Sequence, residues 1–176
     1  MSKKIIFSCF VLAILSGCAA APADKQAMMI KHESVSSIVK DEQKGKFEVN
    51  AVTGGKVTNP LWTSQVSNEN FESALKGSLE ASGLSSSDKA TSLYKIDAEL
   101  VSLDQPMFGL TFDVVSTVNY RVHNASLVKN FPITAKGTAT PSDAFVAITR
   151  LKIANEKSIQ ANIMEFIKQL TASDLK

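Results

Sequence analysis

The side chain with the most specific chemical setting in this sequence is the thiol of Cys18. A thiol is a strong nucleophile and can carry a covalent modification. Two small residues, Ser16 and Gly17, stand directly before it, and Leu15 precedes them. Small residues let a peptidase bind the chain in an extended form. The small residues therefore predict a peptidase cleavage site at this point of the chain.

The segment before this motif has the features of an export signal. Lys3 and Lys4 precede an apolar run from Ile5 to Leu15. This run is about half the roughly 20 residues that a helix needs to span a bilayer. A positive start, a short apolar run and small residues at its end are typical of a signal peptide, predicted here for residues 1–17.

The four residues Leu15-Ser16-Gly17-Cys18 resemble the lipobox of bacterial lipoproteins at every position. The resemblance implies that the signal peptidase recognises the first three residues and that the Cys18 thiol accepts a diacylglyceryl group. The competing interpretation is an ordinary secretory cleavage site with an incidental cysteine. Ala19 stands where an aspartate would favour retention in the inner membrane. The resemblance therefore implies an outer-membrane anchor that faces the periplasm.

The composition of the mature chain excludes some partners. Removing residues 1–17 takes away Cys9, Lys3 and Lys4, so that 17 of the 19 basic residues remain against 17 acidic ones. This balance argues against nucleic-acid binding, which needs a basic face. Cys18 is then the only cysteine, so no disulfide can form within the mature chain.

The sequence gives little indication of a metal site or of catalytic residues. His32 and His123 have no second histidine or cysteine at a spacing typical of metal ligands. Asp97, Glu99 and Asp113 alternate with apolar residues in predicted strands, which indicates a solvated sheet face where ordinary carboxylates gain no acid–base advantage. We therefore predict no catalytic residue, no metal and no cofactor, although this face could still be a docking surface.

A glycine-rich loop from Gly54 to Trp62 is the most distinctive stretch of the mature chain. It is not a phosphate-binding loop, because Asn50 replaces the first glycine of that motif and Val57 follows the lysine. The glycines permit positive φ, Pro60 stiffens the chain, and Trp62 is predicted to close one end of the core.

A second loop, from Asp104 to Leu110, contains the apolar residues Met107, Phe108 and Leu110. Exposed apolar side chains in a loop often mark a contact with a partner or a membrane. Alternatively, the three side chains fold back and cap the helices. The sequence leaves both interpretations open.

Periodicity predicts the elements that position these loops. Alternation of apolar and polar residues predicts four strands near residues 47–51, 94–100, 112–122 and 131–136. A helix is predicted from Ser67 or Asn68 to a stop at Gly83, and a longer one from Asp143 to Leu170 with Ser142 as its cap. The apolar stripe of the longer helix is Phe145, Ile148, Leu151, Ile159, Ile163, Phe166 and Leu170.

The element order β-α-β-β-β-α predicts an α+β two-layer fold, with a four-stranded, mainly antiparallel sheet and two helices on one face. The partner of the first strand stays open, although a crossover through the first helix would allow parallel pairing. Residues 18–27 are predicted to be the lipidated cysteine and a tether, and residues 28–176 a single domain. Within it, residues 28–39 form either a strand or an extended lead-in.

Several runs in the mature chain resemble a family of uncharacterised proteobacterial outer-membrane lipoproteins. They are the loop Gly54–Trp62, the runs Phe71–Leu75 and Ser82–Leu84, and Gly137–Thr140 before the last helix. More loosely, the element order is similar to the lipoprotein of the lipopolysaccharide-assembly barrel and to auxiliary lipoproteins of lipid transporters. These resemblances imply a fold and a location and no particular activity.

We therefore expect a lipid-anchored, non-enzymatic envelope protein that binds a protein or lipid partner as an accessory to assembly or transport. The alternative is a carrier of a small hydrophobic ligand between sheet and helices. A lined cavity between the layers would favour the carrier. A filled core with an exposed apolar loop would favour partner binding.

Overall fold

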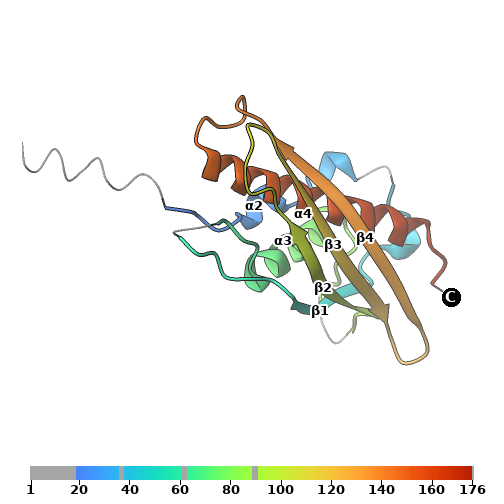
Figure 1. The fold of residues 1–176 in the computed structure, drawn as a ribbon. Coiled ribbons are helices and arrows are strands. Elements are labelled where there is room, and N and C mark those ends of the chain that lie inside the picture. Colours follow the sequence, from blue (N-terminus) through green and yellow to red (C-terminus); the bar gives the residue numbers. More distant parts are fainter. Residues whose placement is uncertain (1–18, 36–37, 61–62, 89–90, 176) are drawn as a thin grey trace, which may run out of the picture.

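The computed structural model describes residues 19–35, 38–60, 63–88 and 91–175. Figure 1 shows a single sheet with the two longer helices on the same face and a short helix beside them. The predicted α+β class is confirmed, and the short helix α2 is an addition. The elements are α2 (Lys25–Met28), 3-10 turns at His32–Ser34 and Asp41–Gln43, β1 (Phe47–Thr53), α3 (Asn68–Ala81), β2 (Tyr94–Asp104), β3 (Phe112–His123), β4 (Val128–Ala139) and α4 (Ala147–Ala172).

The strands lie in the order β1-β2-β3-β4. β1 pairs with β2 in parallel through the α3 crossover, and the other two pairs are antiparallel. The register shifts between Val49 and Ala51, so Val52 is buried and Ala51 is only half-buried. Strict alternation from Phe47 would turn Ala51 toward the core, but the irregularity in pairing breaks the period of two there.

Helix α3 follows its predicted pattern. The Ser67 hydroxyl accepts a hydrogen bond from the backbone N–H of Asn70, and Gly83 ends the helix with a φ of 74°. Because apolar residues recur every three or four positions, one face of the helix is turned to the sheet. The buried residues are Phe71, Ala74, Leu75, Ser78 and Leu79.

Helix α4 begins at Ala147, after the predicted start at Asp143. Ser142 is not its cap, because the Asp143 carboxylate instead accepts hydrogen bonds from the N–H of Thr140 and from Lys157. This closes a turn before the helix. Phe145, predicted on the apolar stripe, precedes the helix and is 93% exposed. The rest of the stripe is buried at Leu151, Ile159, Ile163, Phe166 and Leu170, and Ile148 is half-buried.

Side chains fill the space between α4 and the sheet. The Tyr120 and Phe166 rings stack with centroids 4.0 Å apart, and the Phe131 ring meets Phe166 edge-on at 5.7 Å. All three are buried. Burial of Tyr120 raises the pKa of its hydroxyl well above the ordinary value, because the charged form would lose its hydration. The hydroxyl therefore acts as a hydrogen-bond donor.

A buried polar bridge holds α4 in register with the sheet. The Tyr120 hydroxyl donates to Asn162 Oδ1 at 2.9 Å, and Asn162 Nδ2 donates to the carbonyls of Ser116 at 3.1 Å and Ile133 at 3.0 Å. Ser158 donates to the Ser116 hydroxyl at 2.8 Å. Apolar packing alone would allow the helix to slide, whereas these bonds fit only one register.

We predict that Asn162→Leu lowers the free energy of unfolding by about 1 to 3 kcal/mol, because it leaves the buried Tyr120 hydroxyl without its acceptor. Chemical denaturation measures this loss. The double change Asn162→Leu with Tyr120→Phe should recover part of the stability, since both polar partners are then absent. Wild-type stability of the single variant would contradict this role of the bridge.

Candidate functional site

The residues of the predicted lipidation motif, Leu15, Ser16, Gly17 and Cys18, lie outside the described residues, as does Trp62. The described chain begins at Ala19. No helix within the described ranges combines the length and the apolarity needed to cross a membrane.

The chain is packed on the domain from Ala20 onward. The Ala20 N–H donates to the Pro60 carbonyl at 2.8 Å, and the Ala23 N–H donates to the Gln65 carbonyl at 3.1 Å. Both alanine residues are buried. These contacts lie within residues 18–27, the stretch for which the sequence predicts the lipidated cysteine and a tether.

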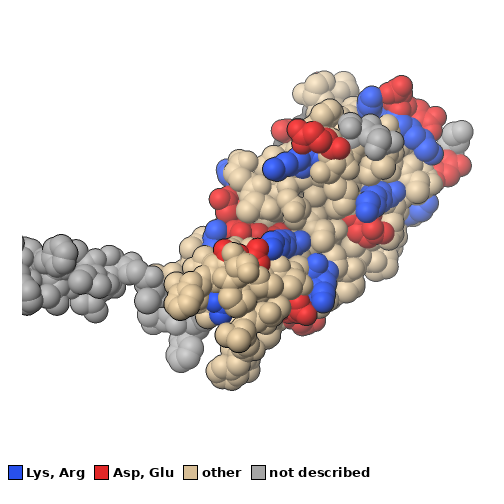
Figure 2. All heavy atoms as spheres, turned by 90° about the horizontal axis from the view of Figure 1, so that it is seen from above, with Lys and Arg blue, Asp and Glu red and all other residues tan. Residues whose placement is uncertain are grey.

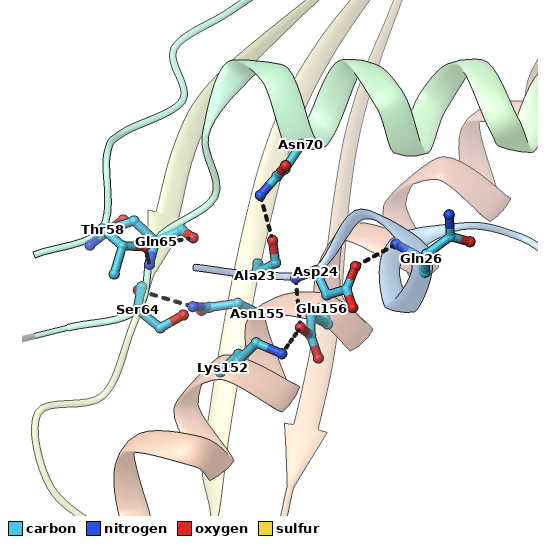
Figure 3. A network of polar contacts seen from close by, with 10 residues as sticks. All are labelled: Ala23, Asp24, Gln26, Thr58, Ser64, Gln65, Asn70, Lys152, Asn155 and Glu156. Atoms are coloured by element: carbon cyan, nitrogen blue, oxygen red, sulfur yellow. Dashed lines mark hydrogen bonds and ion pairs between the residues drawn. The ribbon is translucent and has the colours of Figure 1, made fainter. Parts of the chain in front are cut away.

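A polar network fastens this N-terminal segment to both long helices (Figure 3). The Asp24 N–H donates to Glu156 Oε1 at 2.7 Å, and Lys152 forms an ion pair with the same oxygen at 2.8 Å. Asn70 of α3 donates to the Ala23 carbonyl at 2.9 Å. Glu156 does not belong to the predicted apolar stripe of the helix, yet only 5% of it is exposed. It is a buried carboxylate that holds the entering chain.

Gln105 joins the start of the β2–β3 loop to the same region. Its Nε2 donates to the Ser64 carbonyl at 2.9 Å and to Asn155 Oδ1 at 2.8 Å, and its Oε1 accepts from the Thr63 hydroxyl at 3.0 Å. Asn155 also donates to the Ser64 carbonyl at 3.0 Å (Figure 3). Gln105 therefore gives the loop a rigid base beside the N-terminal segment.

Beyond this base, the apolar side chains of the β2–β3 loop project into solvent. Met107 is 86% exposed, Phe108 87% and Leu110 76%. They do not fold back over the helices, as one of the two interpretations required. Their contact with a partner or a membrane stays a prediction.

The β4–α4 loop carries two further exposed apolar residues, Phe145 and Val146. Buried Arg150 donates from Nη1 to the carbonyls of Ala144 at 2.9 Å and Phe145 at 2.6 Å. Its guanidinium also lies 5.5 Å from the centre of the Phe112 ring. These contacts hold Phe145 outward on a fixed loop.

The start of the same loop is fixed by Asp143. Hydrogen bonds from Lys157 and from the Thr140 N–H lower the pKa of the Asp143 carboxyl to about 2. The carboxylate therefore stays ionised at neutral pH. Phe112 at the start of β3 pairs with Ala139 at the end of β4, so the β2–β3 and β4–α4 loops leave the sheet at the same end.

A third loop at this end contains the glycines noted in the sequence. Gly54 has a φ of 82°, and a Cβ there would lie 2.2 Å from the Leu100 carbonyl oxygen. Only glycine fits this close turn. Val57, two residues after Gly55, is 87% exposed on the loop that receives Ala20.

We name the exposed apolar residues of the β2–β3 and β4–α4 loops the apolar tip. Figure 1 shows both loops at the end of the sheet opposite the β3–β4 hairpin, on the side where the described chain begins. Figure 2 shows protruding tan surface at this end of the domain, without Lys, Arg, Asp or Glu on its visible outermost part. The apolar tip consists of Met107, Phe108, Leu110, Phe145 and Val146.

The carboxylates considered in the sequence, Asp97, Glu99 and Asp113, lie on the outer face of the sheet, and Asp97 and Asp113 have basic partners. Asp97 is 3.0 Å from the His123 ring and 3.8 Å from Arg121. Hydrogen bonds from Thr138 and Lys136 lower the pKa of Asp113, which is half-exposed. Within the described part of the chain, no three His, Cys, Asp or Glu side chains form a group that could hold a metal ion.

No protein-family model and no curated protein matches this sequence. Among solved structures, the chain is similar to a presumed lipoprotein from Caulobacter crescentus CB15, with 13% identity and a TM-score of 0.48 over 80% of this chain and 92% of that one. It is also similar to a hypothetical protein from Chlamydia trachomatis, with 10% identity and a TM-score of 0.46 over 73% of this chain and 94% of that one. At these values neither similarity identifies a family.

Proposed function

We propose that this chain is a lipid-anchored lipoprotein of the bacterial envelope, held through Cys18 on the periplasmic face of the outer membrane. Its domain acts without catalysis and binds a partner as an accessory to assembly or transport. The observation that carries this proposal is the motif Leu15-Ser16-Gly17-Cys18 after a basic start and a short apolar run.

The packing of the N-terminal segment supports an anchor that positions the domain. A long flexible tether would let the domain turn freely, whereas Ala20 and Ala23 are buried and hydrogen bonded to the loop around Pro60. Glu156 and Asn70 add contacts from α4 and α3. Such a short connection keeps one end of the domain next to the membrane.

Two features favour partner binding over carriage of a small ligand. A carrier needs a hollow lined by apolar side chains. Here Tyr120 stacks on Phe166, and the Asn162 bridge occupies the neighbouring space between the layers. The side chains at the apolar tip are exposed, as expected for a surface that contacts a partner.

The residue after the cysteine tests the proposed location. In the sorting rule that the motif implies, Ala19→Asp should move the protein from the outer-membrane fraction to the inner-membrane fraction of a density gradient. Ala19→Ser is the matched control and should leave the distribution unchanged. An unaltered distribution of the aspartate variant would contradict sorting by this rule, and recovery of the wild-type chain in the soluble fraction would contradict the anchor itself.

A further inference from the structure

The apolar tip and the start of the described chain lie at the same end of the domain (Figure 1). The base of the β2–β3 loop, at Gln105, bonds to the segment Thr63–Gln65, and Gln65 in turn accepts the Ala23 N–H. The two features are thus parts of one hydrogen-bonded surface. An anchor on the N-terminal segment therefore also determines which surface the apolar tip faces.

Chain geometry limits how far the anchor can lie from this surface. Two peptide units separate residue 18 from Ala20, and each spans about 3.8 Å at most, so the two Cα atoms lie within about 8 Å of each other. Ala20 itself is fixed by its bond to Pro60. An acyl group on Cys18 therefore brings the membrane surface to this end of the domain.

The chemistry of the tip fits a lipid surface. The stretches Pro106–Thr111 and Ala144–Ile148 contain no charged residue. Inserting them into a bilayer interface therefore carries none of the cost of moving a charge into lipid. A stable protein interface buries about 800 Å² on each partner and needs a matching shape. Five side chains on two protruding loops suit a fluid surface that deforms around them.

We propose, on the basis of the proposed lipid anchor, that the apolar tip inserts into the same leaflet that holds the acyl chains. The anchor confines the domain near the bilayer, so a weak apolar contact is enough to keep the tip inserted. The domain then stands with the β2–β3 and β4–α4 loops in the membrane and with the β3–β4 turn pointing away from it. The outer sheet face is left free for a periplasmic partner.

Site-specific fluorescence in the acylated protein tests this orientation. Once Cys9 is removed and Cys18 is acylated, a new cysteine is the only free thiol, so Phe108→Cys and Phe145→Cys can each be labelled with a polarity-sensitive dye. The matched control is Ala125→Cys in the β3–β4 turn, which is also exposed. β3 separates the two ends by roughly 36 Å at about 3.3 Å per residue. The proteins are reconstituted in vesicles of phosphatidylethanolamine and phosphatidylglycerol with brominated acyl chains.

Insertion predicts a blue shift and quenching by bromine at positions 108 and 145 and neither effect at position 125. High salt should leave these signals unchanged, because apolar contacts are not screened. Equal, water-like emission at all three positions in the anchored protein would overturn the inference. Partitioning of the same samples into a detergent phase measures acylation independently of the dye emission. A protein that is not anchored fails to partition, whereas an anchored protein without an inserted tip partitions but shows water-like emission.

A double variant and a photo-crosslinker distinguish insertion into lipid from contact with a protein. Met107→Ser with Phe108→Ser should keep the wild-type melting temperature, because both side chains are exposed, and should reduce the blue shift at position 145. A photo-crosslinker at position 108 should capture lipid in intact cells. Capture of one protein in place of lipid would overturn the inference and make the tip a protein interface.

Discussion

Cys18→Ala will leave the chain without acyl groups and without cleavage by the lipoprotein signal peptidase, so that unprocessed or mislocalised precursor accumulates. Cys18 carries the only thiol in the proposed lipidation motif. Each buried methylene of an acyl chain contributes about 0.8 kcal/mol to membrane attachment, so losing several chains removes nearly all of it. Gel mobility and membrane fractionation measure both effects.

Cys9→Ala is the matched control for this experiment. Cys9 lies within the predicted signal peptide and leaves with it, so the variant should be processed, acylated and sorted like the wild type. A Cys18→Ala chain with the normal mature mass and a normal outer-membrane distribution would contradict the assignment of the motif.

Phe166→Ala will lower the free energy of unfolding by about 3 to 5 kcal/mol, the range measured when a buried phenylalanine is truncated in other cores. Its ring is fully buried between Tyr120 and Phe131. The surrounding strands are tied by ladder hydrogen bonds and the Asn162 bridge, so the site cannot collapse to fill the cavity. Chemical denaturation of the purified chain gives the difference.

Lys168→Ala provides the control on the same helix. Lys168 is exposed two residues from Phe166, and surface changes of this kind usually alter stability by less than about 0.5 kcal/mol. Equal stability of the two variants would contradict the placement of Phe166 in the core.

Regular periodicity made much of the fold predictable. β3 alternates without interruption, and its apolar residues at alternate positions, Phe112, Val114, Val118, Tyr120 and Val122, are all buried. Helix α3 has both a serine cap and a glycine stop, so local signals and the apolar face agree. Parallel pairing of β1 with β2 depends on contacts far apart in the sequence, and periodicity contains no information on them.

The sequence predictions were wrong where hydrogen bonds to distant residues override the local sequence signals. Asp143 follows Ser142 and precedes an apolar stripe, which is typical of a helix start, but bonds from Thr140 and Lys157 draw its carboxylate into a turn. Glu156 has the sequence signature of a surface residue, yet its partners are the Asp24 N–H and Lys152. Tertiary hydrogen bonds of this kind cannot be detected in the apolar periodicity of the sequence.

The candidate site was predictable in part. The proposed acylation motif is a contiguous pattern, so Cys18 could be selected as a candidate from sequence alone, and Met107, Phe108 and Leu110 could be selected but not placed. Phe145 was assigned to the core because it continues the helical spacing of Ile148 and Leu151. Its outward position follows from Arg150, which holds the Phe145 carbonyl from the first turn of α4. Arg150, next to the apolar stripe, was the only feature of the sequence that could have indicated this position of Phe145.

We propose that Cys18 is the acylated first residue of the mature chain. Mass spectrometry of the N-terminal peptide, taken from protein extracted from bacterial membranes, tests it most directly. We expect a peptide that begins at Cys18 and carries the mass of a diacylglyceryl group on its sulfur. A peptide that begins at another residue, or one in which Cys18 has a free thiol, would contradict it.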